Sequence, residues 1–226
     1  MEYLPNGYTL QIPNGCFPLS TDSIVLADFI RLSKNARVLD LGSGCGTLGL
    51  LLCARDPHCQ VTGVELDPNA HEAALENIRQ NSLQHRLSSI CADLRRVPSE
   101  NYDICISNPP YYTGGPASRE TPTARRDDHC PLEDLFRAAT RSLKFGGDFY
   151  LVHKPEKLAQ LIACGAECGL EAKRLRLVRH RSDGPMALIL LAFRKGAKPG
   201  LVLDEASLHH GNGTPTDYYR ALYHLN

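Results

Sequence analysis

Asn108, Pro109, Pro110 and Tyr111 follow one another directly after the apolar run 102–106. Each proline keeps the backbone of the preceding residue out of the helical region, so this turn is stiff. The amide oxygen of Asn108 and the carbonyl of Pro109 could accept both hydrogens of one exocyclic amine, while the Tyr111 ring stacks on the plane that carries it. We therefore predict a site for a planar amine. A plain proline-rich turn after a strand is the alternative.

A second group of candidate residues surrounds a glycine-rich stretch. Residues 37–41 predict a short buried strand, and residues 42–49 lead from it into an apolar helix. A glycine-rich turn between a strand and a helix lets a ligand approach the backbone N–H groups at the start of the helix. We expect the turn to hold a cofactor through Gly42, Ser43, Gly44 and Gly46.

Three carboxylates, on Asp40, Glu65 and Asp93, stand at or just after the ends of three successive predicted strands. The carboxyl ends of strands in a doubly wound sheet share one edge, so these groups are expected to line one rim of a crevice. Glu65 is placed to accept both hydroxyls of a ribose, and Asp93 to accept from an adenine amine. Asp40 lies near the loop where a ligand ammonium group could bind.

The nature of the cofactor follows from these groups. Gly44, Gly46 and Gly49 match the G-x-G-x-x-G letters of a dinucleotide site, but this match begins after the turn has already started at Gly42. No pair of residues nearby suits hydride transfer. S-adenosylmethionine fits better than a nicotinamide dinucleotide, because it has a ribose, an adenine and a charged amino acid end but no pyrophosphate.

The elements that must position these groups alternate along the chain. Apolar runs with the length of strands lie at 37–41, 61–65, 87–91, 102–106, 149–152, 175–180 and 186–193, and amphipathic segments lie between most of them. This alternation predicts an α/β fold with a doubly wound, seven-stranded, mostly parallel sheet and an antiparallel last strand. Turn signals around residues 8–12 add a small N-terminal hairpin, residues 1–20, ahead of a single domain, residues 21–226.

Composition limits the partners. The 226 residues carry no net charge, but the first 110 hold 8 basic and 12 acidic side chains, so the remainder holds 17 and 13. Local positive charge downstream of the proposed site suits phosphate contacts, although a solvated strand face explains the same pattern. No apolar run suits a membrane span, and neither a signal pattern nor metal-ligand spacing of the nine cysteines is present. We expect a cytoplasmic protein without a metal site.

The motifs resemble those of a known family. Residues 38–46 are similar to the first motif of class I methyltransferases, and residues 108–111 to the fourth motif of their amino-group subfamily. Residues 14–23, 123–127 and 180–183, with 194–196, resemble the bacterial tRNA(Val) adenine-N6 methyltransferases, which modify adenine 37 beside the anticodon. The resemblance implies the Rossmann-like class I methyltransferase fold, S-adenosylmethionine as cofactor and tRNA as substrate, with no obligate protein partner.

The expected roles are as follows. Asn108, Pro109, Pro110 and Tyr111 act in catalysis, with Asn108 also near the cofactor. The residues expected to bind the cofactor are Asp40, Gly42, Ser43, Gly44, Gly46, Glu65 and Asp93, and those expected to contact RNA are Arg119, Arg125, Arg126, Lys173, Arg174 and Arg176.

Alternative functions remain open at this point. Release-factor methyltransferases, which modify a glutamine side chain, resemble the chain in the same four-residue motif but usually carry a larger N-terminal helical domain. A DNA adenine methyltransferase would need a target-recognition domain. A non-catalytic, cofactor-binding RNA module is the third alternative. We expect His129 and His153 at the surface, and the tail tyrosines packed against the sheet rather than stacked on bases.

Overall fold

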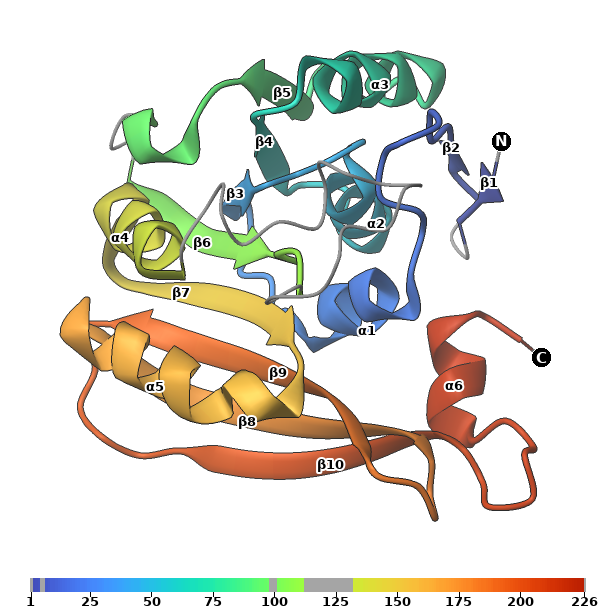
Figure 1. The fold of residues 1–226 in the computed structure, drawn as a ribbon. Helices are drawn as coiled ribbons and strands as arrows, with labels where there is room; N and C mark the ends of the chain where they lie inside the picture. Colours follow the sequence, from blue (N-terminus) through green and yellow to red (C-terminus); the bar gives the residue numbers. More distant parts are fainter. Residues whose placement is uncertain (1, 5–6, 98–100, 112–131, 226) are drawn as a thin grey trace.

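The computed structural model describes residues 2–4, 7–97, 101–111 and 132–225 (Figure 1). Its main sheet has the strand order β10-β8-β9-β7-β6-β3-β4-β5. The strands are β3 (Arg37–Leu41), β4 (Gln60–Glu65), β5 (Leu87–Cys91), β6 (Tyr102–Ser107), β7 (Leu143–His153), β8 (Leu170–Arg181), β9 (Met186–Lys195) and β10 (Val202–His209). The predicted α/β class with a large, mostly parallel sheet is confirmed.

β9 is antiparallel to both of its neighbours, β7 and β8, whereas every other pair in this sheet is parallel. The sheet therefore has one strand more than the seven expected, because β10 adds to the edge beside β8. Val202 and Leu203 are exposed and Leu208 is the one buried residue of β10. Without alternation between buried and exposed positions, the sequence gives no strand signal there.

Helices cover both faces of the sheet. One face carries α1 (Thr21–Phe29), α2 (Thr47–Arg55), α3 (Pro68–Gln80) and α6 (Asp217–Leu222), whose buried side chains belong to one core cluster. The other face carries α4 (Leu132–Ser142) and α5 (Leu158–Glu167), together with the short 3-10 helices η1 (Leu94–Arg96) and η3 (Pro155–Lys157). None of the helices in the described ranges combines the length and apolar character that crossing a bilayer requires.

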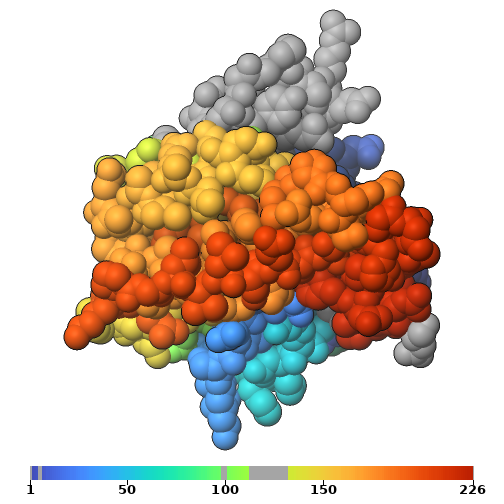
Figure 2. Space-filling view, turned by 90° about the horizontal axis from the view of Figure 1, so that it is seen from below, coloured from blue at the N-terminus to red at the C-terminus, as the bar shows by residue number. Residues whose placement is uncertain are grey.

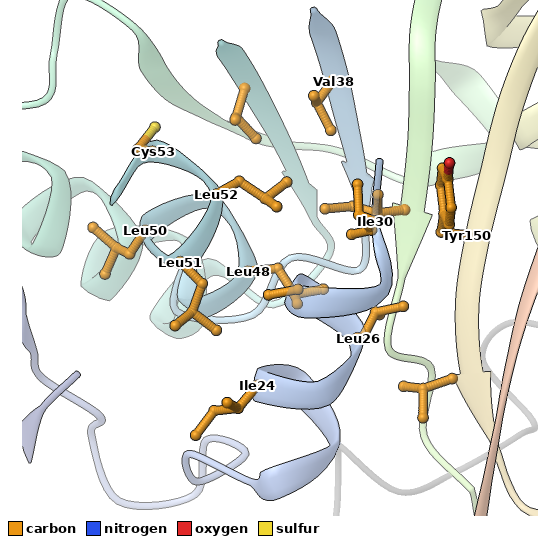
Figure 3. Close-up of a cluster of buried hydrophobic side chains, with 14 of the residues drawn as sticks. Ile24, Leu26, Ile30, Val38, Leu48, Leu50, Leu51, Leu52, Cys53 and Tyr150 are labelled. Atoms are coloured by element: carbon orange, nitrogen blue, oxygen red, sulfur yellow. The ribbon is translucent and has the colours of Figure 1, made fainter. Parts of the chain in front are cut away.

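The core beneath the site explains why these elements hold their places. Leu26 of α1, Ile30 at its C-cap, Leu48 of α2 and Val38 of β3 belong to one cluster of buried hydrophobic side chains (Figure 3). All four are at most 4% exposed. Burying such a side chain stabilises a fold by about 1.5–3 kcal/mol. The C-terminal part of α1 and the first turn of α2 are therefore fixed relative to the sheet.

Capping residues mark the starts of α1 and α3. The Ser20 side chain caps α1 by accepting from the backbone N–H of Ser23, and Asp67 caps α3 with Pro68 in its first turn.

Viewed from below, β10 and the residues that follow it form a continuous orange-to-red band across one face of the molecule (Figure 2). In that band Tyr218, Tyr219 and Tyr223 are partly buried and pack against the core, as expected.

The N-terminal segment is tied to the rest of the chain. Its strands β1 (Glu2–Tyr3) and β2 (Thr9–Leu10) form the predicted antiparallel pair. The fully buried Asn77 of α3 accepts from the backbone N–H of Gln11 at 2.7 Å and donates to the carbonyls of Gln11 and Cys45. One side chain thus joins the segment after β2 to the glycine-rich loop. The division of the chain at residue 20 stays a prediction.

Candidate active site

A pocket of about 400 Å³ opens at the carboxyl ends of β3, β4 and β6. This is the edge at which doubly wound sheets bind ligands. The lining includes eight of the site residues predicted from the sequence: Gly42, Ser43, Gly44, Glu65, Asp93, Asn108, Pro109 and Pro110. The two groups of candidate residues, the glycine-rich loop with its carboxylates and the Asn-Pro-Pro turn, therefore share one pocket.

The glycine-rich loop curves tightly between β3 and α2. The backbone N–H groups of Gly42 and Ser43 both donate to the carbonyl of Val64, at 2.9 and 3.0 Å, which anchors the loop to β4. Gly44 has φ of +54° and Gly46 has φ of +84°, a region that other residues adopt only with strain. Gly46 is the N-cap of α2 and has no side chain to satisfy the first N–H groups of that helix. The start of α2 thus suits a polar ligand.

Glu65, the last residue of β4, faces this loop. Its Oε2 accepts from the backbone N–H of Gly44 and its Oε1 from that of Asp67, both at 2.8 Å. Each carboxylate oxygen can accept more than one hydrogen bond, so both keep capacity for a ligand. Glu65 is therefore fixed beside the loop with acceptor capacity to spare, and its expected binding of ribose hydroxyls stays a prediction.

The carboxyl group of Asp40, unlike that of Glu65, is buried without hydrogen bonds from the described residues. It is 1% exposed, and neither carboxyl oxygen has a hydrogen-bond partner in the described part of the chain. Burial, and then the negative charge of Glu65, raise the pKa of Asp40 to about 8. Asp40 lies behind the loop rather than in the pocket lining. An unpaired buried carboxyl group is costly, so this one suits a ligand that brings positive charge to the loop.

Asp93, which follows the edge strand β5, lines the rim of the pocket on that side. Its carboxylate caps η1 by accepting from the backbone N–H of Arg95 and also pairs with the Arg95 guanidinium. The hydrogen bond from that guanidinium is the main reason that the pKa of Asp93 is lowered to about 2. Asp93 is an ionised acceptor at this rim, and Arg95 shares its oxygens.

The proposed catalytic turn is fixed from both sides. Ser107 donates from Oγ to the carbonyl of Leu41 at 2.7 Å, which joins the end of β6 to the end of β3. Asn108 donates from Nδ2 to Ser23 Oγ at 3.0 Å, and its Oδ1 accepts from the Tyr111 hydroxyl at 2.9 Å. Asn108, Pro109 and Pro110 line the pocket. The amide is held between the start of α1 and its own loop.

Tyr111 is the one member of the turn that does not line the pocket. Its ring packs against the ring of His153, with centroids 5.0 Å apart, and Lys154 Nζ lies 5.2 Å from its centroid. Burial, and then the carboxylate of Asp22, raise the pKa of the Tyr111 hydroxyl. The expected stacking of this ring on a substrate stays a prediction.

The expectation that His153 lies at the surface is wrong: it is 1% exposed at the end of β7. Its Nδ1 accepts from the backbone N–H of Lys154 at 2.8 Å. Burial, and then Lys157 and Lys154, lower the pKa of His153 to about 4, so the ring is neutral at physiological pH. Because β7 lies parallel to β6, aligning these two strands would have placed His153 beside the Asn-Pro-Pro turn. His129 lies outside the described residues.

The candidate RNA-binding residues are not brought to this pocket. Arg174 donates to the carbonyl of Phe29, at the far end of α1 from Ser23. Lys173 lies in the same region and lines a second hollow, of about 260 Å³, together with Arg174. Arg176 makes two hydrogen bonds to Asp204 of β10 and also pairs with Asp28, so its charge is already neutralised. Arg119, Arg125 and Arg126 lie outside the described residues.

Sequence reasoning missed the contribution of the N-terminal segment to the pocket. Cys16, Phe17 and Pro18 line it, as does Ser23 in the first turn of α1. From the sequence we predict this segment as a hairpin ahead of the domain, with no site residue in it. The resemblance of residues 14–23 to the corresponding segment of the family could have indicated that these residues belong to the site.

Comparison with known proteins agrees with this geometry. Residues 19–163 match the Methyltransferase small domain family. A protein named tRNA1(Val) (adenine(37)-N6)-methyltransferase from Aeromonas hydrophila is 30% identical over 89% of this chain and 86% of its own length. A protein of the same name from Tolumonas auensis is 34% identical over 80% of this chain and 78% of its own length.

Among solved structures, a predicted O-methyltransferase from Agrobacterium tumefaciens has a similar fold. The TM-score is 0.76 at 22% identity, and the alignment covers 90% of this chain and 96% of that one. The similarity extends over nearly the whole chain, so it includes the strands that follow the matched family segment.

Proposed function

The chain belongs to the Methyltransferase small domain family, and within it to the tRNA1(Val) (adenine(37)-N6)-methyltransferases, and from this premise we propose how its pocket works. The protein is an S-adenosylmethionine-dependent methyltransferase that modifies N6 of an adenine in tRNA, with adenine 37 beside the anticodon as the target. One observation carries the proposal: the Asn-Pro-Pro turn and the glycine-rich loop line the same pocket. A tRNA substrate implies that the enzyme acts in the cytoplasm.

The cofactor residues have distinct roles in this proposal. Glu65 accepts the ribose hydroxyls, because its oxygens are already fixed by the backbone N–H groups of Gly44 and Asp67. Positive charge on the methionine end of the cofactor, bound at the loop formed by Gly42, Ser43, Gly44 and Gly46, favours the ionised form of Asp40, whose pKa is otherwise raised to about 8, and Asp93 accepts from the adenine amine. When bound, S-adenosylmethionine supplies a methyl group activated by the positive charge on its sulfur.

Asn108 and Pro109 act on the target amine. The lone pair of adenine N6 is conjugated with the ring, so the nitrogen is a weak nucleophile. Asn108 Oδ1 and the Pro109 carbonyl accept its two hydrogens and favour the pyramidal nitrogen on which positive charge develops. To reach these acceptors the base leaves its stack and enters the pocket, as other enzymes that modify bases require. Stacking of Tyr111 on the base is part of this proposal.

No strong general base is required. The amine becomes acidic once positive charge has developed on it, so its proton can leave to water after the new bond forms. The titratable groups of the pocket agree with this scheme. Asp93, whose pKa is lowered to about 2, is a weak base, and the nearby His153 does not line the pocket.

The proposal is tested by offering the protein several amine substrates in parallel. Labelled S-adenosylmethionine is incubated with tRNA1(Val) that lacks the modification, with a release factor and with double-stranded DNA. We expect label in the tRNA alone, located by nuclease digestion and mass spectrometry at N6 of the adenine beside the anticodon.

Each alternative function has its own outcome in this experiment. Label on the glutamine of the release factor would favour the protein methyltransferase. Cofactor binding without transfer to any of the three substrates would favour a non-catalytic RNA module. A tRNA whose target adenine is replaced by guanine is the matched control, because it keeps the fold of the tRNA and removes the target amine from that position.

A further inference from the structure

A buried serine in the first turn of α1 contacts the proposed catalytic amide. Ser23 is 5% exposed and lines the pocket, and its Oγ lies 3.0 Å from Nδ2 of Asn108. At the other end of the amide, Oδ1 accepts from the Tyr111 hydroxyl at 2.9 Å. The two ends of this amide thus have different partners, which come from elements far apart in the sequence.

We propose that Ser23 is a positioning residue that holds the Asn108 amide with its oxygen available to the substrate amine. The inference rests on the proposed function of Asn108. The two ends of an amide are nearly equal in size, so a side chain without partners can turn end for end. In the reversed orientation it presents N–H donors to an amine, and its oxygen is no longer available to accept the hydrogens of that amine.

The position of Ser23 suits this role. Ser23 is the third residue of α1, and its hydroxyl oxygen accepts from Nδ2 of Asn108. The helix start is capped by Ser20, and the next residue, Ile24, is buried in the core (Figure 3). The hydroxyl that contacts Asn108 therefore belongs to a rigid helix rather than to a loop. Preorganisation of a reacting group requires such rigid support.

A matched pair of variants separates the hydroxyl from the shape of the side chain. Ser23→Thr and Ser23→Val add nearly the same bulk at this buried position, but only the threonine keeps a hydroxyl. We expect Ser23→Val to have a kcat about tenfold below that of Ser23→Thr, the effect of losing one hydrogen bond to a preorganised group. The KM for tRNA and the Kd for S-adenosylmethionine should stay within about twofold of each other in the two variants.

A second measurement needs no substrate. The ¹⁵N–¹H signals of the Asn108 side-chain amide report whether Nδ2 has kept its partner. We expect these signals to shift in Ser23→Val and to stay near their wild-type positions in Ser23→Thr. This comparison holds whichever amine the enzyme methylates, so it can fail independently of the proposed function. Lack of transfer to tRNA by the wild-type protein would count against the proposed function instead.

Three results would overturn the inference. Equal kcat and equal Asn108 signals in the two variants would mean that the hydroxyl positions nothing. A selective loss of S-adenosylmethionine binding in Ser23→Val would make Ser23 a cofactor contact. Ser20→Ala is the control for helix integrity, because it removes the cap of α1 without touching Asn108. A loss of kcat in Ser20→Ala as large as in Ser23→Val would assign the effect to the helix.

Discussion

At the scale of a single residue, the carboxyl group of Asp40 makes the stability of the fold depend on pH. Burial raises its pKa to about 8 in the folded protein, compared with roughly 4 for an unfolded chain. Between these values the folded state holds a proton that the unfolded state releases. The contribution of Asp40 to stability is therefore fully present below pH 4 and is lost as pH rises toward 8.

Replacing Asp40 with asparagine removes this titration. We expect the free energy of unfolding of wild type, relative to that of Asp40→Asn, to fall by about 2–4 kcal/mol between pH 5 and pH 8. Urea unfolding of both proteins at the two pH values measures the difference, and the titration of other groups cancels in the comparison. A wild-type protein that follows the same pH dependence as Asp40→Asn would show that Asp40 is ionised throughout.

Single residues also show how far the sequence predicts the site. The spacing of Gly42, Glu65 and Asn108 after apolar runs was enough to place them at one edge of the sheet. The partners of the turn depend on the packing of other elements: Ser23 of α1 accepts from Asn108, and His153 of β7 packs against Tyr111. Local pattern does not contain that information.

At the scale of elements, strand β4 leaves room for the glycine-rich loop because its residue Gly63 has no side chain. Gly63 lies between β3 and β5, and a Cβ atom there would come within 2.6 Å of Ser43 Oγ and 2.8 Å of Ser43 Cβ. The backbone of β4 is paired on both sides, so Ser43 must move instead. Overpacking of this kind typically costs about 1–3 kcal/mol.

We therefore expect Gly63→Ala to weaken the binding of S-adenosylmethionine at least about tenfold, because it displaces the cofactor loop. Isothermal titration measures the Kd. The matched control is Gly165→Ala in α5, where a Cβ would come within 2.5 Å of Phe193 in the core on the other face of the sheet. Both variants should lose stability. Equal Kd values in the two variants would contradict this role of β4.

The elements themselves follow closely from the sequence where their pattern is strong. The predicted strand 87–91 is observed as β5 with the same bounds, and the capped starts of α1 and α3 lie where Ser20 and Asp67 indicate. The edge strand β10 was missed because its exposed apolar residues do not alternate with polar ones. Pairing with β8, a long-range event, makes it a strand.

At the scale of the whole molecule, positive charge is distributed unevenly around the fold. Among the described residues, Lys173 and Arg174 form no salt bridge, whereas Arg176 forms salt bridges with Asp204 and Asp28. Burial, and then neighbouring Arg31, lower the pKa of Arg174, while Tyr150 and Asp204 act in the opposite direction. Lys173 and Arg174 remain our candidates for contacts with the tRNA backbone, away from the pocket.

Lys173→Ala and Arg176→Ala remove the same charge from different surroundings. We expect Lys173→Ala to weaken tRNA binding and to reduce the salt dependence of log Kd by about 0.7–0.9, the effect of one lost phosphate contact. Arg176→Ala should instead cost about 1–2 kcal/mol of stability and leave tRNA binding nearly unchanged. Filter binding over a series of salt concentrations separates the two. An unchanged salt slope in Lys173→Ala would place the RNA on another face.

The most direct test of the whole account is turnover by Asn108→Ala, measured with labelled S-adenosylmethionine and tRNA1(Val) that lacks the modification. We expect kcat to fall by about 100-fold or more, because the substrate amine loses a preorganised acceptor. The Kd for S-adenosylmethionine, determined on the same preparation, should stay close to the wild-type value, which shows that the pocket is intact. Turnover of Asn108→Ala at the wild-type rate would contradict the role of this amide in methyl transfer.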